Sequence, residues 1–153
     1  MIAHAISRRI ATMGPVGWIG PAPGTSASLV TCLLAWPLFT ATGVQGLAAA
    51  AVIVTVFGVW TSDQYCKKSG VADPSEVVID EAAGQLLALA AIGPEGWTDW
   101  VAAFFLFRAF DIVKPWPISR LERFPGGLGV MLDDLAAGLA TAAVVWVIGL
   151  IGF

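Results

Sequence analysis

Long apolar runs separated by short polar segments dominate this chain, and they predict helices rather than strands. No Asp, Glu, Lys or Arg lies between Arg9 and Asp63, and none follows Asp134. The final run, 135–153, would extend about 28 Å as a helix, close to the thickness of a bilayer core. Run length together with Gly and Pro breakers predicts helices over residues 26–42, 45–62, 75–92, 98–113 and 131–152.

These runs predict an all-α fold, namely a polytopic membrane bundle of about four to five transmembrane or partly inserted helices. The helices over 75–92 and 98–113 are short for full spans. Composition agrees with a bilayer, because 58% of the residues are hydrophobic and only 12% are charged. We expect one membrane domain over residues 1–153. The N-terminus is interrupted by Gly and Pro, so we expect it to be retained rather than cleaved as a signal peptide.

Two kinds of connection join the predicted helices. Residues 42–46 and 93–97 make tight turns, whereas 62–75 and 114–129 are long and polar. Alternation across a membrane puts the two long connections and the N-terminal segment on one side. All the basic residues then lie on or near that side, which the positive-inside rule makes cytoplasmic: Arg8, Arg9, Lys67, Lys68, Arg108, Lys114, Arg120 and Arg123. A net charge of −3 with scattered basic residues argues against a nucleic-acid partner.

Two of the predicted helices carry a carboxylate followed four residues later by glycine. Asp80 precedes Gly84, and Asp134 precedes Gly138. A glycine one turn below a carboxylate lets another helix approach closely, so we expect these helices to pack with their carboxylates converging. The stretch from Asp73 also predicts a helix start, with Asp73 as N-cap, Pro74 at the first position and Glu76 in a capping box.

A third helix contributes charges near its cytoplasmic end. Arg108 and Asp111 share a face, and Lys114 precedes a proline, which should end the helix. Crowded carboxylates need a counter-ion, and an all-oxygen set suits Mg²⁺. The predicted metal ligands are Asp80, Glu81, Asp111, Asp133 and Asp134. Two simpler interpretations stay open: Asp133 and Asp134 also suit the dipole at a helix N-terminus, and Arg108 and Asp111 also suit mutual neutralisation.

A Gly- and Pro-rich stretch, 20–28, comes directly before the first predicted helix. Thr25 and Ser28 would lie at its N-terminus on the cytoplasmic side. Free backbone N–H groups, the helix dipole and two hydroxyls suit an anionic phosphate, although helix capping explains the same residues.

Four motifs in this order resemble the phosphatidylglycerophosphatase A family of bacterial membrane lipid phosphatases: PAPGTSAS, VIDEAAG, FRAFDIVKPWPI and PGGLGVMLDDLAAG, over residues 21–138. One position departs from the family pattern, because Ala27 stands where a glycine usually precedes the serine. The resemblance implies Mg²⁺-dependent hydrolysis of phosphatidylglycerophosphate at the inner leaflet of the cytoplasmic membrane. By motif, it implies catalytic roles for Asp80, Glu81, Asp133 and Asp134, and phosphate binding by Thr25, Ser28, Arg108 and Lys114.

Three alternatives stay open at this point. Intramembrane carboxylates also suit a small cation transporter or channel, although such a path needs polar groups at both ends of the bundle. CDP-alcohol phosphotransferases use clustered aspartates too, but their spaced Asp-Gly pattern is missing. Within a phosphatase, the nucleophile is either an activated water or a covalent group such as an aspartate or Thr25. The sequence does not decide the oligomeric state.

Overall fold

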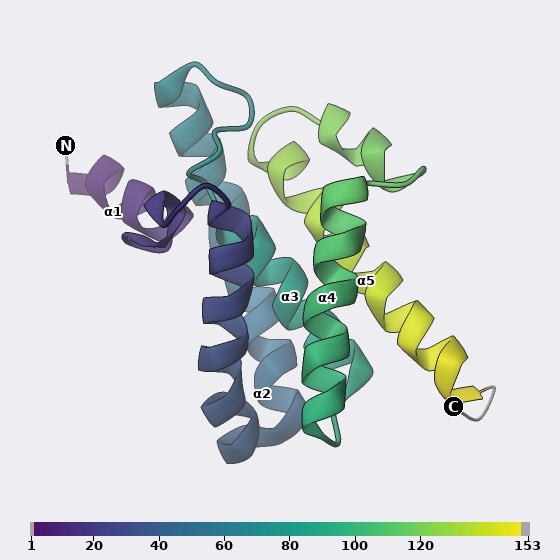
Figure 1. The fold of residues 1–153 in the computed structure, drawn as a ribbon. Helices are drawn as coiled ribbons and strands as arrows, with labels where there is room; N and C mark the ends of the chain where they lie inside the picture. The colour runs from purple at the N-terminus through teal and green to yellow at the C-terminus, as the bar shows by residue number, and fades with distance from the viewer. Residues whose placement is uncertain (1, 151–153) are drawn as a thin grey trace.

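The protein is a bundle of helices in the computed structural model, which describes residues 2–150 (Figure 1). No strand occurs in this range. The α-helices are α1 (Ile2–Ala11), α2 (Pro23–Ser69), α3 (Ile79–Ile92), α4 (Trp97–Val113) and α5 (Gly127–Leu150). Two 3-10 helices, η1 (Val16–Trp18) and η2 (Ile118–Arg123), lie in the connections. The expectation of an all-α fold is therefore confirmed for the described residues.

Helix α2 consists of two limbs, because the chain reverses direction at Gly43 (Figure 1). Gly43 has φ 67° and ψ −161°, a conformation that glycine adopts at little cost because it lacks a Cβ atom. The predicted turn over 42–46 is thus confirmed, and its two flanking helices are the limbs of α2. Pro37 lies inside the first limb, and its backbone angles stay helical.

Helices α3 and α5 cross with their backbones in contact. A Cβ atom added to Gly84 would lie 2.5 Å from the Asp134 carbonyl oxygen, and one added to Gly138 would lie 2.5 Å from the Gly84 carbonyl oxygen. Only hydrogen fits at either position. The predicted close approach of the two acidic helices is confirmed, and it brings the first turn of α3 beside Asp134.

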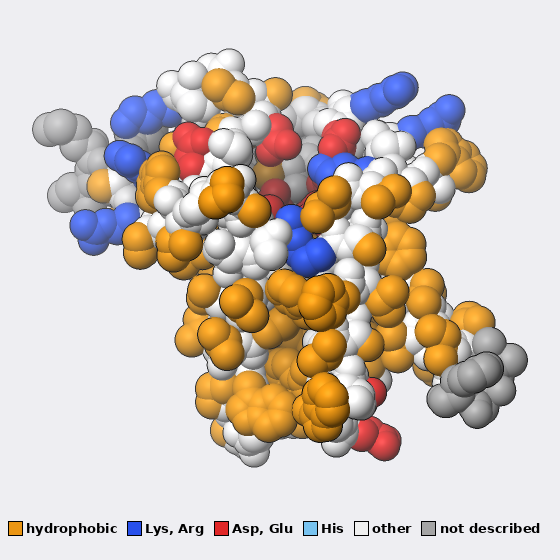
Figure 2. Space-filling model, viewed as in Figure 1, with side chains coloured by type: hydrophobic (Ala, Val, Ile, Leu, Met, Phe, Trp, Pro, Cys, Tyr) orange, Lys and Arg blue, Asp and Glu red, His pale blue; other side chains and the backbone are white. Residues whose placement is uncertain are grey.

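Two helices are long and apolar enough to cross a membrane, α2 and α5. Only 17% and 33% of their apolar windows are buried, so most of this surface faces outward. Figure 2 shows hydrophobic side chains covering the lower part of the bundle, whereas most charged side chains gather at the end that carries α1 and η2. Large outward-facing side chains include Leu33, Leu34, Val52, Val56, Phe105, Trp146 and Leu150. This distribution fits a membrane-associated bundle.

Several predicted boundaries are corrected by the structure. Helix α3 begins at Ile79, four residues later than predicted, and its N-cap is Val78 rather than Asp73. The preceding segment is held instead by tertiary hydrogen bonds, since the Tyr65 hydroxyl donates to Glu76 (2.7 Å) and the Val78 N–H donates to the Ala11 carbonyl (2.9 Å). These long-range contacts outweigh the local capping signal.

The remaining ends differ by varying amounts. Helix α2 begins at Pro23, three residues before the predicted start, and continues to Ser69, seven residues past the predicted end at 62, so the first half of the predicted connection 62–75 is helical. Helix α4 begins one residue before the predicted start and ends at Val113 as predicted, because the residue before Pro115 avoids helical angles. Helix α5 starts at Gly127 rather than at 131, and its predicted end at 152 lies outside the described residues. Helix α1 was not predicted.

We expect Gly138→Ala to lower the free energy of unfolding by about 1–3 kcal/mol, because the added methyl group would overlap the α3 backbone. Gly149→Ala in the same helix is the matched control, since a Cβ atom there meets nothing within 4 Å. Both changes raise helix propensity equally, so their difference isolates the helix contact. Thermal unfolding in detergent, followed by circular dichroism, measures the difference in stability between the two variants. Equal melting temperatures would contradict this packing.

Candidate active site

Three carboxylates from α3 and α5, two of them buried and that of Glu81 half-buried, form the centre of the candidate site. Asp80 and Glu81 lie in the first turn of α3, and Asp134 lies in α5. One oxygen from each lies within 4.8 Å of the others. We call these three residues the carboxylate cluster. The sequence placed all three in one site, and the structure brings them together.

The carboxylate cluster has the donor set that a hard divalent cation requires. Asp80 Oδ1, Glu81 Oε2 and Asp134 Oδ2 are buried without a hydrogen-bond partner among the described residues. Burying unpaired charged oxygens is costly unless a cation or hydrogen bonds compensate. Oxygen-only ligands at this spacing fit Mg²⁺, which carboxylates bind readily.

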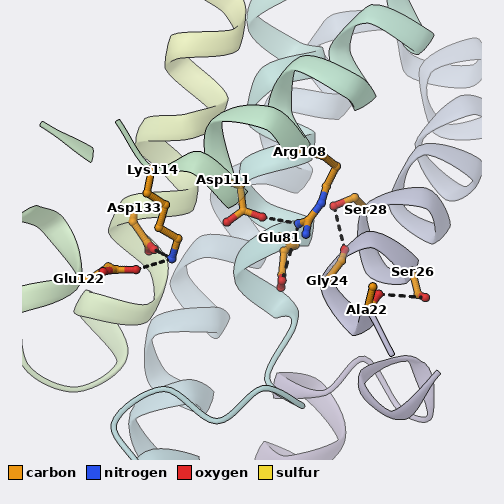
Figure 3. Close-up of polar contacts among 10 residues, drawn as sticks. All are labelled: Ala22, Gly24, Ser26, Ser28, Glu81, Arg108, Asp111, Lys114, Glu122 and Asp133. Carbon is orange, nitrogen blue, oxygen red and sulfur yellow. Dashed lines mark hydrogen bonds and ion pairs between the residues drawn. The ribbon is translucent and has the colours of Figure 1, made fainter. Parts of the chain in front are cut away.

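Helix α4 supplies a positive charge beside the cluster (Figure 3). The Arg108 guanidinium donates a hydrogen bond to Asp111, and its NH1 atom lies 3.9 Å from Glu81 Oε1. Arg108 Nε is buried without a partner. Asp111 is also close to Asp134, with which it interacts electrostatically. Asp111 thus borders the cluster and its carboxylate faces Arg108, and its role as a metal ligand stays a prediction.

Asp133 takes a different partner from its neighbour in sequence. Lys114 Nζ donates to Asp133 Oδ2 and to Glu122 Oε1, each at 2.5 Å (Figure 3). Asp133 thus faces Lys114, whereas Asp134, the next residue of α5, faces the carboxylate cluster. The five predicted metal ligands therefore separate into the carboxylate cluster, Asp111 beside Arg108, and Asp133 beside Lys114.

Two ion pairs, with Asp133 and Glu122, hold the Lys114 ammonium group in place. Burial by itself lowers the pKa of Lys114, but hydrogen bonds from its ammonium group to Asp133 and Glu122 outweigh burial and hold that pKa well above its usual value. Lys114 also ends α4 with φ 45°, a region that side chains other than glycine rarely adopt. Because two carboxylates already occupy Lys114, Arg108 is the better candidate for binding a phosphate oxygen.

The start of α2 borders the cluster through a glycine that sequence reasoning missed. A Cβ atom on Gly24 would lie 2.0 Å from Glu81 Oε1 and 3.2 Å from Arg108 NH1. Only a residue without a side chain allows both groups to lie there. The Pro-Gly-Thr motif contains this glycine, but the sequence analysis assigned phosphate binding to the hydroxyl residues of the segment and no role to Gly24.

The two predicted hydroxyl residues differ in access. Thr25 is partly exposed in the first turn of α2. Ser28 is fully buried, and its hydroxyl donates to the Gly24 carbonyl at 3.0 Å. Neither caps the helix, because the N-cap is Ala22 and no side chain bonds there. Phosphate binding by Thr25 and Ser28 stays a prediction, and Thr25 is the more accessible of the two.

Gln85 is a second residue that sequence reasoning missed. It lies on α3 four residues after Glu81, is fully buried, and has no partner for either amide atom among the described residues. Residues four apart share a helix face, so the amide continues the face that carries Glu81. A glutamine within an apolar helical run was the available signal.

Comparison with known proteins gives this geometry its context. The profile of the family described as phosphatidylglycerophosphatase A matches residues 9–149. The chain belongs to this family. It is 37% identical to phosphatidylglycerophosphatase A of Haemophilus influenzae over 133 residues, which cover 86% of this chain and 82% of the relative. It is also 37% identical to phosphatidylglycerophosphatase A of Escherichia coli over 129 residues, covering 83% and 74%.

A further relative has a different name. A Bacteroides thetaiotaomicron protein, provisionally named a phosphatidylinositol-3-phosphatase, is 38% identical over 138 residues, covering 84% of this chain and 86% of the relative. No solved structure matches the chain. Membership of the phosphatidylglycerophosphatase A family shows that the chain is a phosphatase enzyme, and this favours catalysis over the transporter or channel hypothesis.

We expect Gly24→Ala to lower turnover by about tenfold or more, because the methyl group would displace Glu81 and Arg108 from their positions. Both side chains are flexible, so the free energy of unfolding should change by less than about 1 kcal/mol. Gly96→Ala is the control, since a Cβ atom there makes only an ordinary contact with Thr98 at 3.7 Å. Full activity of Gly24→Ala in a phosphate-release assay would count against this placement of Glu81.

Proposed function

We propose that this protein is a Mg²⁺-dependent phosphatase that converts phosphatidylglycerophosphate to phosphatidylglycerol and inorganic phosphate. The observation that carries the proposal is the carboxylate cluster, with three unpartnered buried oxygens, in a member of the phosphatidylglycerophosphatase A family. Two relatives named phosphatidylglycerophosphatase A support this choice of substrate. We assign Asp80, Glu81 and Asp134 as the Mg²⁺ ligands.

A bound Mg²⁺ ion would supply positive charge for the phosphate oxygens and make a coordinated water more acidic. The residues of the chain account for the other requirements. Arg108 lies at the edge of the cluster, and its planar guanidinium suits two phosphate oxygens at once. Asp111 holds Arg108 in that orientation through their hydrogen bond. A carboxylate of the cluster, or Asp111 beside it, is within reach to accept a proton.

The groups around the cluster fix its shape. Lys114 ties Asp133 on α5 to Glu122 in η2, so it fixes the connection 114–126 against the start of α5. We propose that Asp133 acts through this contact of its Oδ2 atom; its other oxygen, Oδ1, is buried without a hydrogen-bond partner among the described residues. Gln85 offers an amide on the face of Glu81, where it is able to bind a water molecule or a phosphate oxygen.

We further propose that the bundle crosses a bacterial inner membrane several times with this site at the cytoplasmic leaflet. The outward-facing apolar surface of α2 and α5 supports spanning. The basic residues of α1, the end of α2 and η2 lie at the same end as the cluster, which agrees with the positive-inside rule. In this orientation the acyl chains stay in the leaflet while the headgroup phosphate reaches Arg108.

We expect Asp80→Asn, Glu81→Gln and Asp134→Asn each to lower Mg²⁺-dependent phosphate release by at least about 100-fold, because each removes a charge needed to hold the cation. Glu95→Gln, an exposed position in the turn at the opposite end, should retain full activity. The assay uses purified protein in detergent with phosphatidylglycerophosphate. Full turnover of Asp80→Asn and Asp134→Asn, or faster release from phosphatidylinositol 3-phosphate, would contradict the assignment.

Metal binding is also measurable without turnover. Millimolar Mg²⁺ should raise the melting temperature of the wild type, since a ligand that binds only the folded state stabilises it. Asp134→Asn should lose this response. Without Mg²⁺ the same variant should melt at a higher temperature than the wild type, because it removes one of three crowded buried charges. A wild-type melting temperature that is independent of Mg²⁺ would contradict the proposed metal site.

A further inference from the structure

A second cleft lies between α1 and the C-terminal end of α2. Its volume is about 940 Å³, and none of its lining residues belongs to the carboxylate cluster. The lining combines basic, aromatic and small side chains: Ala5, Arg8, Arg9, Thr12, Gly14, Pro15, Trp18 and Lys68. An adjoining cavity shares Arg8 and Lys68. We call the larger one the α1 cleft.

Three cations of the α1 cleft have no anionic partner. Arg8, Arg9 and Lys68 are exposed, and none forms an ion pair within the described part of the chain. Lys67 next to them is different, because it pairs with Asp63 at 2.6 Å. Figure 2 shows basic side chains gathered beside α1. Like charges held around one cleft create a positive potential that attracts an anion.

Apolar side chains flank the same cations. The Arg8 guanidinium stacks over the Trp18 ring at 5.0 Å, and Trp18 is 50% exposed. Ile19, the residue after Trp18, and Ile6 in α1 are each 48% exposed. Tryptophan beside arginine is typical of a protein surface at the level of lipid headgroups. Inorganic phosphate makes no apolar contacts, whereas a phospholipid presents an anionic headgroup and acyl chains together.

We propose that the α1 cleft binds the headgroup of an anionic phospholipid that is not hydrolysed. Arg8, Arg9 and Lys68 contact the phosphate, and the exposed ring of Trp18 lies against the upper acyl chains. The bound lipid fixes α1 at the membrane surface. This inference rests on the proposed placement of the bundle in a membrane, but it needs none of the catalytic residues.

The test is native mass spectrometry of the full chain in a neutral detergent, titrated with phosphatidylglycerol or with phosphatidylcholine. The wild type should retain one phosphatidylglycerol and retain phosphatidylcholine far more weakly. The triple variant Arg8→Gln/Arg9→Gln/Lys68→Gln should bind phosphatidylglycerol about 100-fold more weakly, at about one factor of five per charge. Glutamine keeps most of each side chain's length. The double variant Arg9→Gln/Lys68→Gln, which preserves the Arg8–Trp18 contact, should bind phosphatidylglycerol about 25-fold more weakly than the wild type.

The matched control removes three cations from the same end of the molecule. Lys67→Gln/Arg120→Gln/Arg123→Gln should retain phosphatidylglycerol within about twofold, because these residues lie outside the α1 cleft. Equal retention of both lipids, equal loss in the control and cleft variants, or displacement of the lipid by millimolar inorganic phosphate would overturn the proposal. Lipid retention is measured without turnover, so its failure is distinguishable from failure of the proposed phosphatase activity.

Discussion

The contact between the backbones of α3 and α5 is the constraint on which the site depends. Gly84 and Gly138 meet without side chains between them, so two helices far apart in sequence approach closely enough for Asp134 to face Asp80 and Glu81. Three carboxylates at this spacing repel one another, and packing in the apolar bundle below them must hold them in place. The helix crossing therefore sets the spacing of the carboxylates on which the proposed cation site depends.

The two cationic side chains near the carboxylate cluster, Arg108 and Lys114, have different partners. Arg108 reaches the cluster and keeps one guanidinium nitrogen without a partner, so it remains available to a ligand. Lys114 is shared between Asp133 and Glu122, so it acts as a structural bridge. The difference follows from position: Arg108 projects from within α4, whereas Lys114 terminates α4 and faces η2 and the start of α5.

The molecule also separates its two polar regions. Buried carboxylates lie between α3, α4 and α5, whereas unpaired cations surround the α1 cleft at the end of α2. Because the cations of the α1 cleft lie away from the carboxylates, they leave the acidic cluster open to the proposed Mg²⁺ ion. An enzyme acting on a lipid phosphate needs both a site for the reacting group and a surface that suits the membrane, and the two regions provide these separately.

The sequence alone predicted the helices α2 to α5 but not α1, and it predicted the turn at Gly43 and the end of α4 before Pro115. It also predicted the convergence of Asp80, Glu81 and Asp134, because hydrophobic runs, proline and paired Asp–Gly spacings act locally or along one helix face. It could not separate Asp133 from Asp134, place Gly24 against Glu81, or move the start of α3 past Asp73. Those outcomes depend on which residues face each other between two helices, and only the tertiary structure determines these pairs.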